Sequence, residues 1–92
     1  MSRVPLIAAH VVSGAKADML GDETLTAADA ISRQADRYYP VDVFPYLREA
    51  FFTEVEGFTD LATLEGNSAR QDVLDDMETV VQWLQQRAEA PL

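Results

Sequence analysis

The last third of the chain constrains the fold most strongly, because residues 68–89 carry a long apolar pattern of helical period. Apolar residues recur there at spacings of three and four, which place side chains on one face of an α-helix. At 100° per residue they fall within an arc of about 120°. They are Val73, Leu74, Met77, Val80, Val81, Leu84 and Ala88. With Ser68 or Asn67 as N-cap, the pattern predicts a helix of roughly 33 Å whose apolar face must be covered.

Turn-forming residues divide the preceding sequence into shorter segments of the same period. Pro5 and Gly21 delimit a first predicted helix over residues 5–20. A strand over residues 4–12 is the alternative, because the β-branched pair at 11 and 12 weakens the helix prediction. A second helix is predicted over residues 26–39, with Thr26 as N-cap and Pro40 as its end.

Residues 43–56 predict a third helix, which begins after an Asp42 cap, has Pro45 in its first turn and ends at Gly57. Its large apolar residues share one face and are expected to form the centre of the core. They are Phe44, Leu47, Phe51, Phe52 and Val55. Arg48 lies within this face, so we expect it to form an ion pair with an acid from another helix.

A short helix over residues 59–65 completes the set. Helices with one apolar stripe each, joined by short turns, are typical of a compact bundle. With 92 residues and 48% apolar composition, the sequence predicts an all-α single domain over residues 1–92, a bundle of four to five helices with a long C-terminal helix. The chain has no cysteine, so disulfides and thiolate metal sites are excluded, and no cofactor is expected.

The acidic charge is concentrated in one part of the chain. The formal net charge is −9, and residues 49–78 hold nine acids but only one base, Arg70. Such a charge repels phosphate backbones and anionic lipid surfaces, so neither direct nucleic-acid binding nor membrane binding is expected. A protein partner with a basic surface is favoured. The apolar stretch Val4 to Val12, followed by Ala15-Lys16-Ala17, imitates a secretory signal but is short and contains His10, so a cytoplasmic location is predicted.

Few residues suggest catalysis or metal binding. His10, the sole histidine, is interpreted as partly buried in an apolar stretch. Residues 18–29 resemble a calcium-binding loop in part, with suitable oxygen donors at its first, fifth, ninth and twelfth positions. Leu20 and Glu23 occupy the third and sixth positions, where the loop needs an oxygen donor and a glycine. The favoured interpretation is a polar turn that leads into a capped helix.

Aromatic residues outside the expected core leave two alternatives open. Trp83 lies about 120° from the centre of the last helix's apolar arc, on a ridge that it shares with acids. It either anchors a partner or, as preferred, packs against the N-terminal helix. Tyr38, Tyr39 and Tyr46 flank the 40–45 turn and form either the edge of the core or a contact patch.

These features predict a non-catalytic protein-binding module, an inhibitor or regulator that presents the acidic surface of residues 49–78 to a basic site on its partner. In the strongest form of this hypothesis the acids imitate nucleic-acid phosphates, as in phage-type inhibitors. The alternatives are a homo-oligomeric assembly subunit, such as a homodimer, and a small helical enzyme or metal-binding protein. The predicted contact residues are Glu56, Asp60, Glu65, Asp72, Asp75, Asp76, Glu78 and Trp83.

Overall fold

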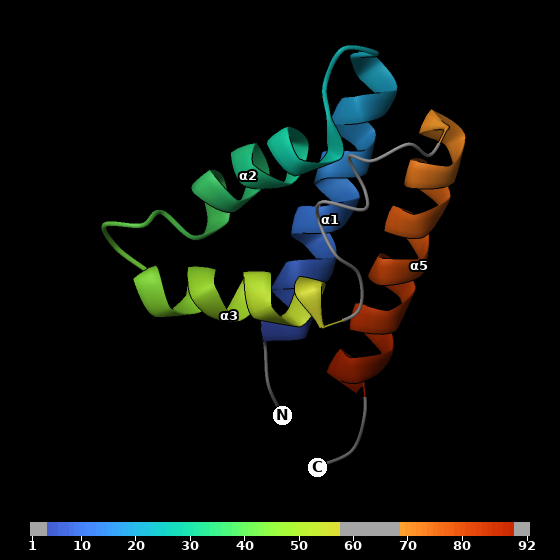
Figure 1. Cartoon of the computed structure of the whole chain (residues 1–92). Coiled ribbons are helices and arrows are strands. Elements are labelled where there is room, and N and C mark those ends of the chain that lie inside the picture. The colour runs from blue at the N-terminus through green and yellow to red at the C-terminus, as the bar shows by residue number, and fades with distance from the viewer. Residues whose placement is uncertain (1–3, 58–68, 90–92) are drawn as a thin grey trace.

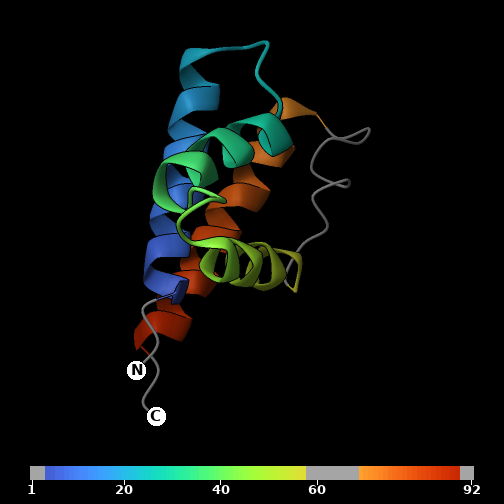
Figure 2. The same ribbon diagram turned by 90° about the vertical axis from the view of Figure 1, so that its left-hand side faces the viewer.

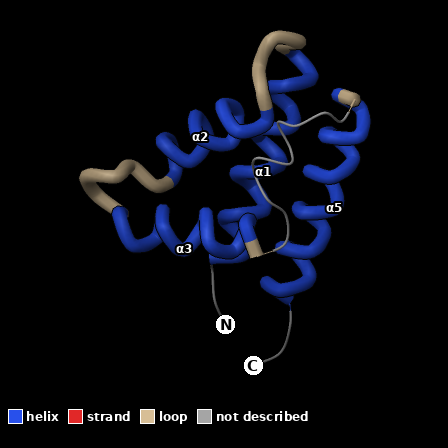
Figure 3. Tube along the Cα trace, viewed as in Figure 1, coloured by secondary structure: helices blue, strands red, loops and turns tan. Residues whose placement is uncertain are grey.

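A computed structural model describes residues 4–57 and 69–89, and these residues form four α-helices (Figures 1 and 3). The helices are α1 (Val4–Gly21), α2 (Ala27–Tyr38), α3 (Pro45–Glu56) and α5 (Arg70–Glu89). The all-helical prediction and the long C-terminal helix are confirmed. The strand alternative for residues 4–12 is wrong, because α1 covers that stretch from Val4 onward. The short helix predicted over 59–65 lies outside the described residues.

Helix α1 is the centre of the arrangement and contacts each of the other three helices. Helix α5 runs alongside it in the opposite direction (Figure 1). Helices α2 and α3 run transverse to α1, first away from it and then back, and the turn between them forms an outer edge of the molecule (Figures 1 and 2).

The core lies where α1 meets its neighbours. Helix α1 buries a face of small and medium side chains, including Ala8, Val12, Ala15 and Met19. All seven apolar residues predicted for the last helix are buried, so the periodicity of residues 68–89 identified the covered face of α5 correctly. The small side chains of α1 let the other helices approach its axis closely.

Helix α3 corrects the prediction that its aromatic face is the centre of the core. Phe51 and Val55 are completely buried, but Phe44 is 43% and Leu47 39% exposed. Only the C-terminal half of α3 lies against the other helices, and its N-terminal half extends outward to the α2–α3 turn (Figure 1). The first turn of α3 therefore has no neighbouring helix to cover its apolar side chains.

The helix ends are formed by local hydrogen bonds. Thr26 caps α2 as predicted, because its Oγ1 accepts a hydrogen bond from the backbone N–H of Asp29 at 3.2 Å. The predicted Asp42 cap of α3 is wrong: Phe44 is the N-cap residue and makes no side-chain capping bond. Instead the Phe44 N–H donates to the Pro40 carbonyl at 2.8 Å, and Pro45 begins the helix, where a missing donor costs nothing.

Gly14, in the interior of α1, lies where a larger residue would meet a side chain of α2. A Cβ at this position would lie 3.1 Å from the side chain of Gln34 on α2. Gln34 is itself buried, and its Nε2 donates to Asp18 Oδ2 at 2.6 Å. The missing side chain thus leaves room for a buried polar contact between α1 and α2.

Arg48 forms the predicted ion pair with another helix. Its Nη1 lies 2.8 Å from Asp36 Oδ1 of α2 and donates to the Tyr39 carbonyl at 3.2 Å. The guanidinium also lies over the ring of Phe52, 5.4 Å from its centroid. These contacts join α2 to α3 beneath the turn that connects them.

Candidate functional site

The predicted contact residues on α5 form an exposed acidic surface. We call it the acidic face; it consists of Asp72, Asp75, Asp76 and Glu78, all exposed. At 100° per residue these carboxylates cover an arc of about 160° on the side of α5 opposite its buried residues. Four of the eight predicted contact residues therefore lie together on the solvent side of one helix.

The acidic face keeps most of its charge uncompensated. Glu78 pairs with Lys16 of α1, whose Nζ lies 3.0 Å from Glu78 Oε2. Within the described residues, no ion pair engages Asp72, Asp75 or Asp76. Asp72 lies in the first turn of α5, where a negative charge interacts favourably with the helix dipole. Three carboxylates thus remain available to an external cation.

The other predicted contact acids do not join this face. Glu56 is exposed in the last turn of α3. Asp60 and Glu65 lie outside the described residues.

Trp83 lies where α5 meets the end of α3. It is partly buried against the core and lines an open hollow of about 290 Å³. Its neighbour Arg87 covers the ring, with the guanidinium carbon 5.0 Å from the centroid. Arg87 Nε in turn lies 3.1 Å from Glu54 Oε2 of α3. The tryptophan therefore contributes to the joint between α3 and α5, and a role in binding a partner stays a prediction.

Residues 18–29, which resemble a calcium-binding loop in part, bind a side chain from far along the sequence through their backbone carbonyls. Arg70, at the start of α5, directs its guanidinium at three carbonyl oxygens, one in the last turn of α1 and two in the α1–α2 connection. Its Nη2 donates to Met19 and to Asp22, each at 2.6 Å, and its Nη1 donates to Leu25 at 3.1 Å. Because Met19 lies in the last turn of α1, the cation also compensates the negative end of that helix.

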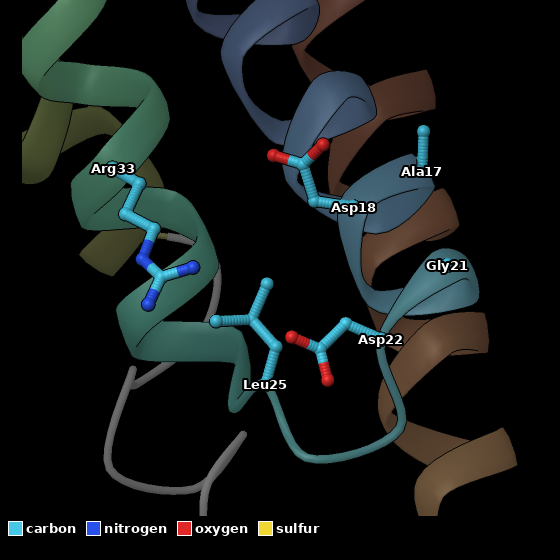
Figure 4. Close-up of a pocket in the computed structure, with 6 residues that line it drawn as sticks. All are labelled: Ala17, Asp18, Gly21, Asp22, Leu25 and Arg33. Carbon is cyan, nitrogen blue, oxygen red and sulfur yellow. The ribbon is translucent and has the colours of Figure 1, made fainter.

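The carboxylates of the same region are engaged by their neighbours. Asp22 accepts hydrogen bonds from the Thr24 hydroxyl at 2.7 Å and from the Thr24 N–H at 2.9 Å, and these bonds lower its pKa. Asp18 accepts from Gln34, as described above. Asp18 and Asp22 line an open hollow of about 420 Å³ with Arg33 on its far side (Figure 4). Over residues 4–57 and 69–89, no three acids or histidines gather as a metal site would require.

His10 differs from its interpretation as partly buried. Its side chain is exposed, because it lies on the face of α1 that the other helices leave uncovered.

A second exposed surface surrounds the α2–α3 turn, where the sequence left open whether the tyrosines form a contact patch. Tyr46 is 85% exposed, and Val41 and Val43 are 62% exposed. With Phe44 and Leu47 from α3 they form an almost continuous apolar stretch of sequence. We call this surface the apolar cap; it consists of Tyr38, Val41, Val43, Phe44, Tyr46 and Leu47.

The three tyrosines that flank the turn divide between the core and the exposed surface. Tyr39 is buried, with its ring 5.5 Å from that of Phe51, and belongs to the core. Tyr38 and Tyr46 are exposed and belong to the cap. The sequence signal was present: a turn bounded by Pro40 and Pro45 holds two valines and a phenylalanine, where turns are ordinarily polar.

Comparison with known proteins gives no further guide to the site. The chain matches no protein-family model, and no curated protein or solved structure matches it. None of the helices in the described part of the chain combines the length and the apolar character needed to span a bilayer.

Proposed function

We propose that this chain is a non-catalytic protein-binding module, an inhibitor or regulator that presents the acidic face of α5 to a basic site on its partner. The observation that supports the proposal most directly is the set of three exposed carboxylates, Asp72, Asp75 and Asp76, without an ion pair among the described residues. An exposed cluster of like charges costs stability, and a partner of opposite charge would relieve that cost.

The rigidity of α5 favours binding through this face. The helix is held to the rest of the molecule by its seven buried apolar residues, by Arg70 at its start and by Arg87 near its end. The carboxylates therefore keep fixed relative positions before a partner arrives, which reduces the entropic cost of association. Consecutive members lie about 1.5 to 4.5 Å apart along the helix axis.

The partner's chemistry follows from the charge. Residues 49–78 hold nine acids and one base, so the complementary surface is rich in arginine and lysine. Proteins that bind nucleic-acid backbones carry such surfaces. In its strongest form the proposal is that the acidic face occupies a nucleic-acid-binding site in place of phosphates.

Affinity capture from extracts of the native host tests the proposal. The wild-type chain is compared with a triple variant, Asp72→Asn, Asp75→Asn and Asp76→Asn, which removes three charges and keeps the side-chain shapes. We expect the wild type to retain a basic protein that elutes as salt rises, because exposed charges are screened over about 10 Å at 0.1 M salt. We expect the triple variant to bind it on the order of 10- to 100-fold more weakly.

A second triple variant controls for net charge alone. Glu23→Gln, Asp29→Asn and Glu49→Gln remove the same charge from exposed positions outside α5. This control is expected to bind like the wild type, and an added polyanion such as duplex DNA should displace the partner if the face imitates phosphates. Equal retention by both triple variants and the wild type would contradict the proposal.

A further inference from the structure

The apolar cap holds six of the seven large apolar side chains that are exposed among the described residues. A buried aromatic side chain covers 150–250 Å², so the exposed fractions of Tyr38, Phe44 and Tyr46 amount to about 350 Å² before the three aliphatic residues are added. The largest apolar patch of a typical monomer is about 300–600 Å² in total. Each side of a stable interface covers about 800 Å². An interface of that size would need the polar rim in addition to the cap.

The charges around the cap balance one another. Its rim holds two carboxylates, Asp36 and Asp42, and two guanidinium groups, Arg37 and Arg48, so residues 36–48 are formally neutral. The rest of the molecule carries the whole charge of −9. A surface that meets its own copy must be close to neutral, because two like-charged surfaces repel.

The cap also lies away from the acidic face. The α2–α3 turn forms one edge of the molecule, while α5 lies on the other side of α1 (Figures 1 and 2). Two copies joined through their caps would therefore keep their acidic faces apart. A pairing through α5 would instead bring the two sets of carboxylates together.

The rim offers complementary groups to a second copy. Arg37 and Asp42 are both exposed, and neither takes part in an ion pair within the described residues. In a two-fold interface each contact occurs twice, so the Arg37 of each copy has a carboxylate of the other copy to face. The Arg48–Asp36 pair and the hydrogen bond from Phe44 to the Pro40 carbonyl hold the cap in one shape before association.

We infer that the apolar cap is the interface of a homodimer, in which Tyr46, Phe44 and Val43 of one copy pack against the cap of a second copy. The inference does not depend on the proposed function of α5. If both hold, the dimer carries two acidic faces that point away from each other, and it binds two basic sites.

Sedimentation velocity over a concentration series tests the interface. We expect the wild type to change from monomer to dimer between about 1 and 300 µM, a range typical of modest interfaces. The variant Val43→Ser with Tyr46→Ser should weaken the dimer at least about tenfold, because it removes two largely exposed apolar contacts. Leu20→Ser is the matched control: Leu20 is 66% exposed near the end of α1, outside the cap, and its loss should leave the dimer unchanged.

The dependence on salt distinguishes dimerisation through the cap from binding of a basic partner to the acidic face. Because the two copies repel through their net charge, added sodium chloride should strengthen the dimer, whereas it should weaken binding to a basic partner. Circular dichroism confirms that each variant remains folded. A wild type that stays monomeric at every concentration overturns the inference, and so does a dimer that survives the cap substitutions. A monomer that binds phosphatidylcholine vesicles through the cap also overturns it and assigns the surface to lipid.

Discussion

Two adjacent tyrosines at the end of α2 show how one residue of sequence separates the core from the surface. Tyr38 is exposed in the apolar cap, whereas Tyr39 is buried against Phe51. The hydroxyl of Tyr39 is also buried, and it has no hydrogen-bond partner among the described residues. A buried polar atom without a partner lowers stability, so this oxygen is a local cost within an otherwise apolar contact.

We predict that Tyr39→Phe stabilises the protein. The variant keeps the ring contact with Phe51 and removes the unpartnered hydroxyl, and the expected gain is about 1 kcal/mol in the free energy of unfolding at neutral pH. Urea unfolding at pH 7 measures it. A variant less stable than the wild type would show that the hydroxyl has a partner in solution.

The stabilities of the wild type and Tyr39→Phe should differ more at high pH. Burial raises the pKa of Tyr39 from 10.0 to about 12. Between these two values the unfolded chain releases the tyrosine proton while the folded chain keeps it, so ionisation favours unfolding and the wild type loses stability as pH rises. Tyr39→Phe lacks this proton, and its advantage should therefore widen above pH 10. An advantage that stays constant with pH would contradict the raised pKa.

For charged residues, the sequence predicts the need for a partner but not the identity of that partner. An arginine inside an apolar stripe needs a partner, so an ion pair for Arg48 was predictable, but its identity as Asp36 depends on the angle between α2 and α3. Arg70 was visible only as the lone base among residues 49–78. Its carbonyl acceptors lie about fifty positions earlier, and nothing in the spacing of the sequence connects them.

At the scale of elements, periodicity was reliable where a helix is covered along its whole length. Helix α5 has one apolar arc, and α1 is its principal neighbour, so the pattern of residues 68–89 identified every residue of its buried face. Helix α3 has a broader apolar surface and is covered only over its C-terminal half. A sequence reports which residues share a face, but the extent of overlap between two helices depends on their crossing geometry. For this reason the exposure of Phe44 and Leu47 was not predicted.

Two phenylalanines of α3 should differ sharply when truncated. Phe51→Ala is expected to lower the free energy of unfolding by about 3–5 kcal/mol, because its ring is wholly buried. Phe44→Ala should cost less than about 1 kcal/mol, because solvent already reaches much of its ring. If Phe51→Ala prevents folding, Phe51→Leu gives a measurable intermediate loss.

Urea titration at low protein concentration measures these differences without a contribution from self-association. Equal losses in the free energy of unfolding for the Phe44 and Phe51 variants would contradict the structure and support the original prediction that the whole aromatic face of α3 is the centre of the core.

At the scale of the whole molecule, charge and apolar surface are separated. The acidic face lies on the first half of α5, the apolar cap lies at the α2–α3 turn, and α3 extends from the cap to the C-terminal half of α5 (Figure 1). The sequence located the acidic excess correctly, because charge can be counted without a structure. Whether the acids share a face could be predicted within α5 from its helical period, but not for acids on separate elements.

The concentration of charge predicts that salt stabilises the fold. Raising sodium chloride from about 0.01 M to about 0.15 M shortens the screening length from about 30 Å to about 8 Å and weakens repulsion among the acids. The melting temperature should therefore rise by a few degrees, and the rise should be smaller for the variant with Asp72, Asp75 and Asp76 changed to Asn. A falling melting temperature would mean that ion pairs such as Lys16–Glu78 outweigh the repulsion.

The central place of α1 has a consequence for how the protein is made. Its longest partner, α5, begins 49 positions after α1 ends. At a synthesis rate of about 5–20 residues per second, the ribosome completes α5 about 3–14 s after α1. Throughout that interval the apolar side of α1 lacks its principal cover. We therefore expect early pairing with α2, which is completed sooner, to cover part of α1 during that interval.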